Sequence, residues 1–496
     1  MNNNYNTLAK AIRFATLAAI AAPASVMAGG FSLNEQSAAT SGYANAGAAA
    51  HAADASTVFF NPAGMSKLSG TNVSFGASVL DIDAEAKGSS QVTTNRVGLP
   101  ENGSEGGDIA DPAVLPGLFV THEVNDSIDV GFALHAPYGL AADYDNDFEG
   151  KFFADKTELS VISFSPSLSI SNGQGLSMGA GINIMYGEGR LSRFQDIRGL
   201  LAQSPDIQAA AANAGVPVSA AADAVADNYE ANFGAPYSDV EGDDVAVNFR
   251  VGFLYEISPS TQVGLTYQTA TEFNLEGDVK VTGAPNSSDV SVGPGGAQIN
   301  SQLPELSEKA SVPLDIPESI SVGLSHELTD SVTLLAGATY ARWSRFEELD
   351  VFSEEGNNGQ VAALLGTQGD QPLTHVTEEW KNTWQFNVGG IWQATPKWQL
   401  KAGYAYDESP VDEYVTARIP SQDRHWLTLG TQWKDAQSGW TVDAAVGTLI
   451  FDGNAKVSDR EYSHDDPTGD PVTAAGYDAE YDLSAWSASL QVSKAF

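Results

Sequence analysis

The 496-residue sequence contains no cysteine and few basic residues. The absence of cysteine excludes disulfide scaffolds, thiolate metal sites and thiol nucleophiles together. Against 24 Lys and Arg stand 63 Asp and Glu, which gives a net charge of −39. Because nucleic-acid binding draws its affinity from basic side chains that displace counterions, we expect no nucleic-acid partner.

Long hydrophobic runs are also missing. Beyond residue 30 no stretch of about 18 apolar residues occurs, which excludes a bundle of membrane-spanning helices. Two catalytic signatures, His-Glu-x-x-His and the phosphate-binding P-loop, are absent as well. We therefore expect neither an enzyme nor a cofactor, and catalysis is kept only as a minor alternative.

The first residues have the layout of a secretory signal peptide. Lys10 and Arg13 precede an apolar stretch over residues 14–22, and small residues lead to a cleavage site after Ala28. The apolar stretch is too short to span a bilayer. The sequence therefore predicts a signal peptide over residues 1–28 and export from the cytoplasm.

The rest of the chain is dominated by alternating strands. From Ile162 to Ile170 apolar residues alternate with serines, so that one face of an extended strand is apolar and the other polar. The same alternation recurs over 176–186, 245–257, 320–328, 384–392, 398–406 and 486–496. With weaker examples included, about fourteen strands are predicted. Several are long enough to cross a bilayer at the tilt that barrel strands usually have. The fold class is all-β, with a transmembrane antiparallel β-barrel over residues 71–496.

Three features place the apolar face outward, toward lipid, instead of inward as in a soluble sandwich. The polar face is rich in Gly, Ser, Asn and Gln, which are too small and too polar to fill a core. The chain ends on the aromatic Phe496, an ending common among bacterial outer-membrane barrels that the barrel assembly machinery reads. Aromatic residues also lie near strand ends, as expected of membrane-interface girdles; they are Tyr186, Tyr267, Trp343, Trp384, Trp392, Trp398, Tyr404, Tyr406, Trp426, Trp433, Trp440 and Trp486.

Short turns and long acidic excursions alternate between the strands. The external loop 196–243 contains alanine runs that favour small helices, whereas the loop 282–313 is rich in Gly, Pro and Ser. The acidic run Asp143, Asp145, Asp147 is a weak calcium candidate, because carboxylate oxygens suit Ca²⁺ but the spacing of an EF-hand is missing.

Residues 29–70 differ from the strands that follow. They show no long alternation, and they contain Asn61, Pro62 and Ala63 after two phenylalanines. Their apolar content argues against a disordered tail. We interpret this segment, called the hatch below, as a plug inside the barrel.

Several stretches resemble the FadL family of outer-membrane transporters for long-chain fatty acids and hydrocarbons (OmpP1/FadL/TodX). The matching stretches run in family order over nearly the whole mature chain; they are 30–37 and 54–64 in the hatch, 137–141 in the third-strand region, 342–346 at the ninth strand, 407–411 at the end of the eleventh strand, and 419–427. The long loops match poorly.

The resemblance implies a monomeric, fourteen-stranded barrel in the outer membrane of a Gram-negative bacterium. Its hydrophobic ligand would be captured by the external loops, bound in an internal apolar pocket and released sideways through the barrel wall, which bypasses the lipopolysaccharide layer. The lateral opening is expected at a kink of the third strand, at Pro137, Tyr138 and Gly139.

The resemblance also implies ligand-binding residues. Arg193 matches an arginine near the fatty-acid headgroup, and Leu191, Phe194 and Phe31 are candidate pocket walls. A guanidinium suits a carboxylate because it can bind both oxygens. Where some members supply a lysine before the tenth strand, this chain has His375 and Val376, which keeps aliphatic or aromatic hydrocarbons open as alternative ligands. A general diffusion porin is a less favoured alternative.

Overall fold

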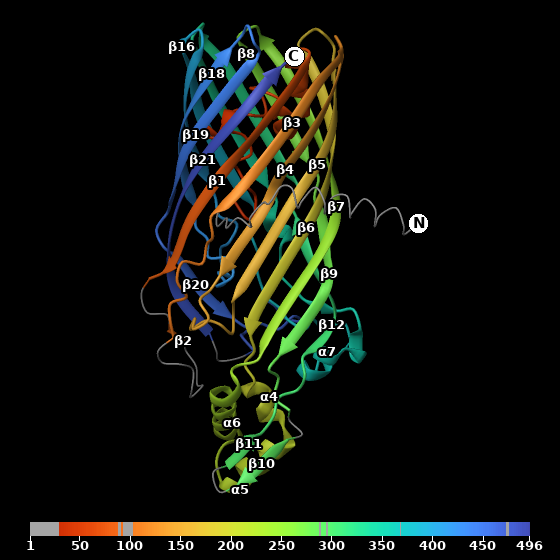
Figure 1. Ribbon diagram of the computed structural model, residues 1–496, viewed down its shortest axis with the longest axis vertical. Helices are drawn as coiled ribbons and strands as arrows, with labels where there is room; N and C mark the ends of the chain where they lie inside the picture. Colours follow the sequence, from red (N-terminus) through yellow and green to blue (C-terminus); the bar gives the residue numbers. More distant parts are fainter. Residues whose placement is uncertain are drawn as a thin grey trace.

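The computed structural model describes residues 29–87, 91–92, 103–286, 289–293, 296–367, 369–472 and 476–496. The expected signal peptide, residues 1–28, lies outside this part of the chain. The described strands form a closed antiparallel barrel of fourteen strand positions, which confirms the predicted fold class (Figure 1). The first and last strands close the barrel, with Asn72 paired to Ala495. Among the described residues, no helix combines the length and the apolar character needed to cross a membrane.

Each wall position pairs with its neighbours in sequence, as in an up-and-down barrel. Two positions consist of two consecutive strands each. In order around the barrel the wall is formed by β1 (Thr71–Ala86), β3 (Ala113–Asn125), β4 (Ile128–Asp143), β5 (Lys156–Ser171), β6 (Leu176–Phe194), β7 (Tyr237–Ser258), β8 with β9 (Thr261–Gln268 and Thr271–Thr282), β12 with β13 (Leu306–Ile316 and Ser319–Thr329), β14 (Val332–Ala341), β16 (Thr383–Thr395), β17 (Trp398–Asp407), β18 (Arg424–Asp435), β19 (Trp440–Phe451) and β21 (Gly476–Ala495).

The two ends of the barrel differ. One end, the short-turn end, carries tight connections and the chain's last residue, and the other, the long-loop end, carries the excursions (Figure 1). Helices α4 (Arg198–Gln203), α5 (Pro205–Ala214) and α6 (Val218–Phe233) occupy the loop between β6 and β7, as its alanine runs predict. The remaining loop elements are β2 (Gln91–Val92), β10 (Val290–Gly293), β11 (Gly296–Ile299), β15 (Phe352–Ser353), β20 (Ala455–Arg460), η2 (Trp343–Arg345), η3 (Gly356–Asn358) and α7 (Gln360–Leu365).

Both long loops are shorter than predicted, because the strands continue beyond the membrane. β7 begins at Tyr237, inside the predicted loop 196–243, and β12 begins at Leu306, inside the predicted loop 282–313. In β12 the buried residues Ala310, Val312 and Leu314 face inward. The alternation is inverted here, with apolar side chains inside and polar side chains outside, which hides it from a search for lipid-facing strands.

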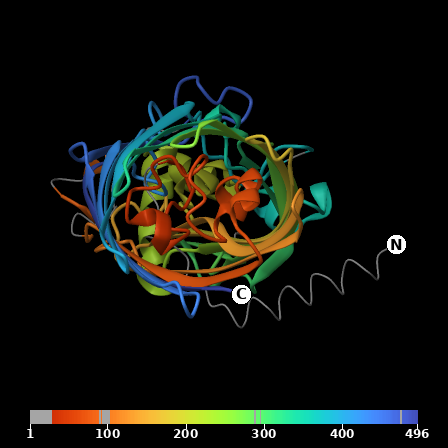
Figure 2. The ribbon, with the colours of Figure 1, turned by 90° about the horizontal axis from the view of Figure 1, so that it is seen from above.

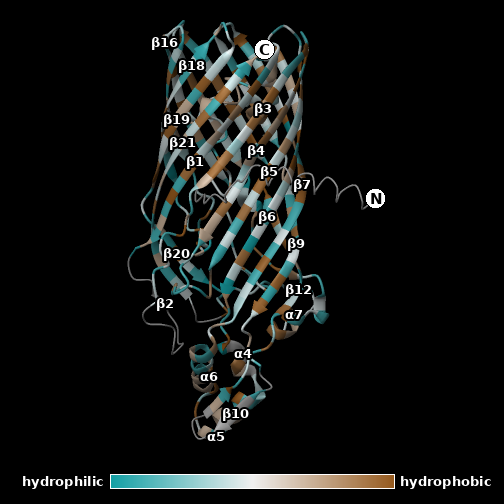
Figure 3. Ribbon diagram, in the orientation of Figure 1, coloured by the Kyte–Doolittle hydropathy of each residue, from teal (hydrophilic) through white to brown (hydrophobic). Residues whose placement is uncertain are grey.

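The outward face of the short-turn half is apolar, as predicted for lipid contact. Phe249, Val388 and Leu429 are about half exposed or more, at 52%, 55% and 64%, and Figure 3 shows hydrophobic and hydrophilic positions alternating along the strands. Three residues of the predicted aromatic girdle are instead buried, namely Tyr186, Trp343 and Trp426. The 342–346 stretch also lies just past the ninth strand, β14, in the turn η2, which places Trp343 inside the barrel.

The hatch lies inside the barrel (Figure 2). Its short helices are α2 (Ala38–Ser41), α3 (Thr57–Phe60) and η1 (Pro62–Lys67). A Cβ on the wall glycines Gly264 and Gly403 would lie 1.8 Å from the Ala49 carbonyl oxygen and 2.1 Å from the Tyr43 carbonyl carbon. The small lumen face predicted from the sequence therefore exists because hatch backbone occupies that space.

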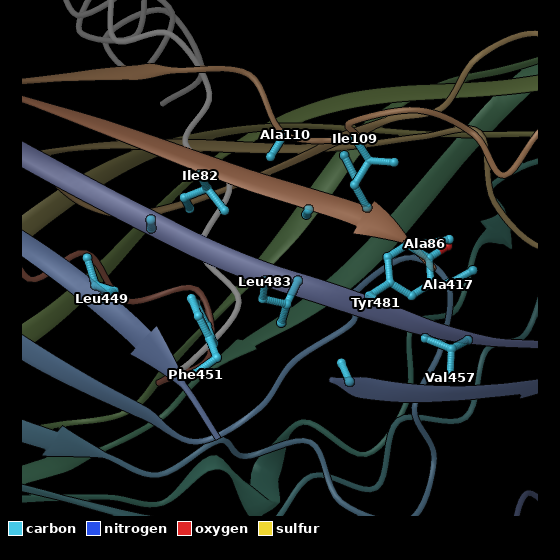
Figure 4. Close-up of a cluster of buried hydrophobic side chains, with 14 of the residues drawn as sticks. Ile82, Ala86, Ile109, Ala110, Ala417, Leu449, Phe451, Val457, Tyr481 and Leu483 are labelled. Carbon is cyan, nitrogen blue, oxygen red and sulfur yellow. The ribbon is translucent and has the colours of Figure 1, made fainter. Parts of the chain in front are cut away.

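Apolar side chains fill the barrel beyond the hatch, toward the long-loop end. One cluster gathers around β1, β20 and β21 and includes Ile82, Phe451 and Leu483 (Figure 4). A second cluster includes Phe31 and inward residues of β4 to β12. This second cluster surrounds the cavity described next.

Candidate ligand-binding site

An apolar cavity lies between the hatch and the long-loop end of the barrel. It encloses about 40 Å³. Inward side chains of consecutive strands from β4 to β12 form its wall, and hatch and loop residues close it; its lining includes Phe31, Leu140, Leu159, Leu191, Leu275 and Leu314. Barrel closure and loop packing thus bring together apolar residues up to 388 positions apart in the sequence, from Phe31 to Ile419.

Phe31 closes the cavity from the hatch side. It is 1% exposed, and its ring centroid lies 4.7 Å from Trp343, 5.5 Å from Phe346 and 5.4 Å from Trp380. The contacts with Trp343 and Phe346 are edge-to-face and that with Trp380 is tilted, and together they favour one position of the ring. The preceding Gly30 has a φ of +65°, and a Cβ there would lie 2.4 Å from the Trp343 ring, so only glycine fits.

A second, smaller cavity adjoins the first and contains two arginines. Arg193 and Arg418 both line it, together with Leu191, Leu349 and Val376. Leu191 and Leu349 line the apolar cavity too. The two cavities are therefore neighbours, one mainly apolar and the other lined by two arginines.

Arg418 is buried and held by backbone and hydroxyl oxygens. It donates to the Lys156 carbonyl (3.2 Å), the Thr157 hydroxyl (3.0 Å) and the Ser192 carbonyl (3.2 Å). Burial and the nearby Arg193 charge lower its pKa to about 10. The buried Nε atoms of both arginines have no hydrogen-bond partner. Donors without acceptors are costly when buried, and an anion would satisfy them.

The acidic groups near the two arginines differ in how far they are ionised at neutral pH. The nearest carboxylate to Arg193 is Glu461, whose oxygen lies 3.7 Å from a guanidinium nitrogen. Burial raises the pKa of Glu378 to about 8 and that of Asp459 to about 6. At neutral pH Glu378 is thus mostly protonated and contributes little negative charge, whereas Asp459 is mostly ionised.

The third strand of the barrel, β4, is interrupted at Pro137. The register with β5 shifts between the pairs His135–Ser163 and Tyr138–Val161. On its other side, the described pairing of β4 with β3 ends at His135 and Gly117. The wall therefore lacks direct β3–β4 pairing beyond this point, as a bulge at a barrel strand allows.

The hatch fills this place in the wall. The Leu33 amide donates to the Pro137 carbonyl at 3.0 Å, and the Gly139 amide donates to the Phe31 carbonyl at 2.9 Å. Ser32 and Tyr138 form the bridge between these bonds. Residues that close the apolar cavity thus also pair with the free edge of β4.

The hatch motif anchors the plug to the wall. The Asn61 side chain donates to the carbonyls of Ala49 (2.6 Å) and Phe253 (3.0 Å) and accepts from the Ala63 amide (3.0 Å). Pro62 occupies the first position of η1, where its missing amide hydrogen costs nothing. A Cβ on Gly252 would lie 2.0 Å from the Asn61 amide oxygen, so the wall is shaped around this side chain.

The structure brings together Arg193, Leu191 and Phe31 of the predicted binding residues. Phe194 does not line either cavity; its ring packs on Tyr237, with 5.1 Å between centroids. Arg418 was missed, although it directly precedes the family-like stretch 419–427. Its importance comes from loop folding, which no local pattern reveals.

The calcium candidates Asp143, Asp145 and Asp147 are not part of the metal-ligating group found among the described residues. Asp143 pairs with Lys156, and Asp147 accepts a hydrogen bond from Ser104 at 2.7 Å. Val376 lines the cationic cavity, whereas His375 pairs with Asp350.

Comparisons with known proteins agree with this architecture. The family model described as outer membrane protein transport protein (OMPP1/FadL/TodX) matches residues 18–496. An outer membrane protein of Neisseria meningitidis is 29% identical over 92% of each chain. The long-chain fatty acid transport protein of Escherichia coli O6:H1 is 26% identical over 94% of each chain.

Solved structures show the same fold. A FadL homologue of Pseudomonas aeruginosa superposes with a TM-score of 0.74 at 24% identity, covering 94% of this chain and 99% of that one. The toluene transporter TodX of P. putida has a TM-score of 0.61 at 15% identity, with the same coverage.

Proposed function

Because the chain belongs to the OMPP1/FadL/TodX family of outer-membrane transport proteins, we propose that its substrates are long-chain fatty acids. The family consists of passive transporters of hydrophobic compounds and not of enzymes, and its members lie in the outer membrane of Gram-negative bacteria. Our proposal concerns the specificity for fatty acids and the route by which the ligand is released.

The observation that carries the proposal is the junction of the two cavities. An acyl chain gains about 0.8 kcal/mol for each methylene that it buries, and the apolar cavity offers such burial. The unsatisfied guanidinium donors of Arg193 and Arg418 lie where a carboxylate would then be placed. A neutral hydrocarbon would make no use of this charge.

Release is proposed to occur sideways, at the interruption of β4. Phe31 closes the apolar cavity, and its carbonyl pairs with Gly139 in the same wall. Displacing the segment 31–33 would therefore enlarge the cavity and uncover the unpaired edge of β4 in one movement. The ligand would enter the membrane there without crossing the lipopolysaccharide layer.

Uptake of aliphatic or aromatic hydrocarbons is the second candidate. It is favoured by Val376, which supplies no charge to the cationic cavity at the place where some family members have a lysine. The two candidates differ in what the arginines contribute to affinity.

Binding measurements separate them. Oleate and the uncharged oleyl alcohol would be titrated into the detergent-purified protein, its Arg193→Gln and Arg418→Gln variants and a control. Arg460→Gln is the control, because Arg460 is held by Asp478 at 2.8 Å and lines neither cavity. A charge-assisted hydrogen bond contributes about 1.5–3 kcal/mol, so we expect oleate affinity to fall roughly tenfold or more in either cavity variant.

Oleyl alcohol should bind wild type and variants alike. Equal oleate affinity in all four proteins would remove the arginines from the site. Tight binding of neutral ligands with no binding of oleate would favour the hydrocarbon reading.

A further inference from the structure

Four side chains of the kinds that bind metal ions lie close together in the loops at the long-loop end. They do not line either cavity. Each offers one nitrogen or oxygen atom, and these atoms all lie within 4.8 Å of one another. The group, called the loop cluster, consists of Glu348, Asp350, His375 and His464. The first three come from the loop between β14 and β16, and His464 comes from the segment between β20 and β21.

A short backbone ladder positions three of the four residues. Leu349 and Val376 exchange two amide-to-carbonyl hydrogen bonds, of 2.9 and 3.2 Å, and Glu348 bridges Thr377. Alternate residues of an extended ladder point to opposite sides. Leu349 and Val376 therefore line the cationic cavity, while the loop cluster lies on the reverse side of the same ladder.

The hydrogen bonds around His375 define its tautomer. The Thr377 hydroxyl donates to the Pro467 carbonyl at 3.0 Å, so toward His375 Nε2, also 3.0 Å away, it can only accept. Nε2 thus carries a hydrogen, and in the neutral ring Nδ1 carries a lone pair. That lone pair faces the Asp350 carboxylate oxygen at 2.6 Å, which requires a cation between the two atoms: a proton or a metal ion.

Asp350 supplies a second, independent observation. It is only 2% exposed, and its Oδ2 has no hydrogen-bond partner. His464 Nδ1 lies 2.9 Å from that oxygen, yet it too makes no hydrogen bond. Two buried polar atoms that face each other without a hydrogen bond are costly, and a shared metal ion would satisfy both.

We propose that the loop cluster binds one divalent transition-metal ion, with Zn²⁺ the best-fitting ion. Tetrahedral donors about 2.1 Å from zinc are separated by about 3.4 Å. The nitrogen-to-oxygen distances of 2.6, 2.9, 3.7 and 3.8 Å in the loop cluster lie on both sides of this value. Two imidazoles with two carboxylates suit zinc, whereas Ca²⁺ and Mg²⁺ prefer oxygen ligands alone. Thr377 orients His375 as outer-shell partners of metal ligands do.

Bound metal joins two loops that are distant in the sequence. It connects the ladder behind the cationic cavity to the segment before β21, so that the ladder is held against the barrel. The metal site does not depend on which hydrophobic compound the cavities take.

Calorimetric titration of Zn²⁺ into chelator-stripped, detergent-purified protein tests the proposal. We expect one site, binding Zn²⁺ in preference to Ca²⁺, and at least about a hundredfold weaker in Asp350→Asn and His464→Gln, beyond the loss typical of an outer-shell change. His425→Gln is the matched control, because His425 also faces a carboxylate, that of Asp452 at 2.9 Å, but outside the loop cluster. Absence of a saturable site, or equal affinity in all variants, overturns the proposal.

A measurement on the unchanged protein covers the case in which a variant does not fold. Zn²⁺ should protect His375 and His464 from diethylpyrocarbonate, as read by mass spectrometry, and leave the modification of His425 unaltered. Equal modification of all three histidines with and without Zn²⁺ would contradict the site.

Discussion

The Gly139 amide donates a hydrogen bond of 2.9 Å to the carbonyl of Phe31. This bond joins the start of the hatch to the edge of β4, directly after the interruption at Pro137. The ring of Phe31 closes the apolar cavity on its other side. Phe31 thus contacts both the apolar cavity and the interrupted pairing of the barrel wall. Movement of Phe31 would open the cavity and the wall together.

A disulfide between positions 32 and 138 should lock the wall. Ser32 and Tyr138 form a bridge without mutual hydrogen bonds, a pair type with Cα atoms about 4.5 Å apart, within the range that disulfides span. The sequence has no other cysteine to interfere. We expect Ser32→Cys with Tyr138→Cys to take up labelled oleate several-fold more slowly when oxidised and to recover after reduction. Each single variant serves as a control, and unchanged uptake in the oxidised double variant would argue against lateral release here.

Replacing Asn61 by alanine should loosen the hatch. The change removes the side-chain donor to the carbonyls of Ala49 and Phe253, at about 1 kcal/mol for each lost hydrogen bond. We expect wild type to show no large steady conductance in planar bilayers and Asn61→Ala to show frequent openings. Asn232→Ala, in the exposed part of α6, should behave as wild type. A large steady current through wild type would instead indicate an open porin.

Gly30→Ala should release the start of the hatch. Alanine adds both the strain of a φ of +65° and a contact 2.4 Å from the Trp343 ring. Gly173 has a nearly identical φ of +66° with nothing within 4 Å, so Gly173→Ala adds the strain alone. We expect hydrogen–deuterium exchange at residues 31–33 to accelerate in Gly30→Ala only. Equal exchange in both variants would mean that the packing against Trp343 does not hold this segment.

Stability should depend on pH through Glu378. Its pKa is raised by burial from 4.5 to about 8, so its neutral form favours the folded state. That contribution is complete below about pH 4.5 and is lost as the pH rises through 8. We expect Glu378→Gln to flatten the fall in the free energy of unfolding between pH 5 and 9, by an amount on the order of a few kcal/mol. Denaturant titrations in detergent measure this, with the exposed Glu413→Gln as control; parallel curves for both variants would refute the assignment.

Much of the barrel could be predicted because lipid imposes a strict pattern on the strands that it contacts. Val247, Phe249 and Val251 alternate with polar residues, and they are outward and exposed as expected. Tyr186, Trp343 and Trp426 could not be placed in this way, since an aromatic residue near a strand end can face lipid, the hatch or a loop. Strand β12 was not predicted for a related reason. Beyond the membrane the outside of the wall faces water instead of lipid, so the apolar side chains of this strand point inward.

The binding residues were predictable only in part. Arg193 was predicted from the family resemblance, and Leu191 and Phe31 were predicted as pocket walls. All three line the two cavities, whereas Phe194 packs on Tyr237. Arg418 and the loop cluster were not found, because their partners are brought together by loops whose sequences carry no periodic signal.

The sequence by itself determined the fold class, the approximate number of strands and the glycine-rich lumen that admits the hatch, because strand alternation and side-chain size are local properties. Only the tertiary structure decided which charged groups meet. Arg193 lies beside Arg418, 225 positions away, and His375 faces Asp350 with His464. These contacts between distant residues depend on barrel closure and loop packing, which therefore determine the chemistry of the long-loop end.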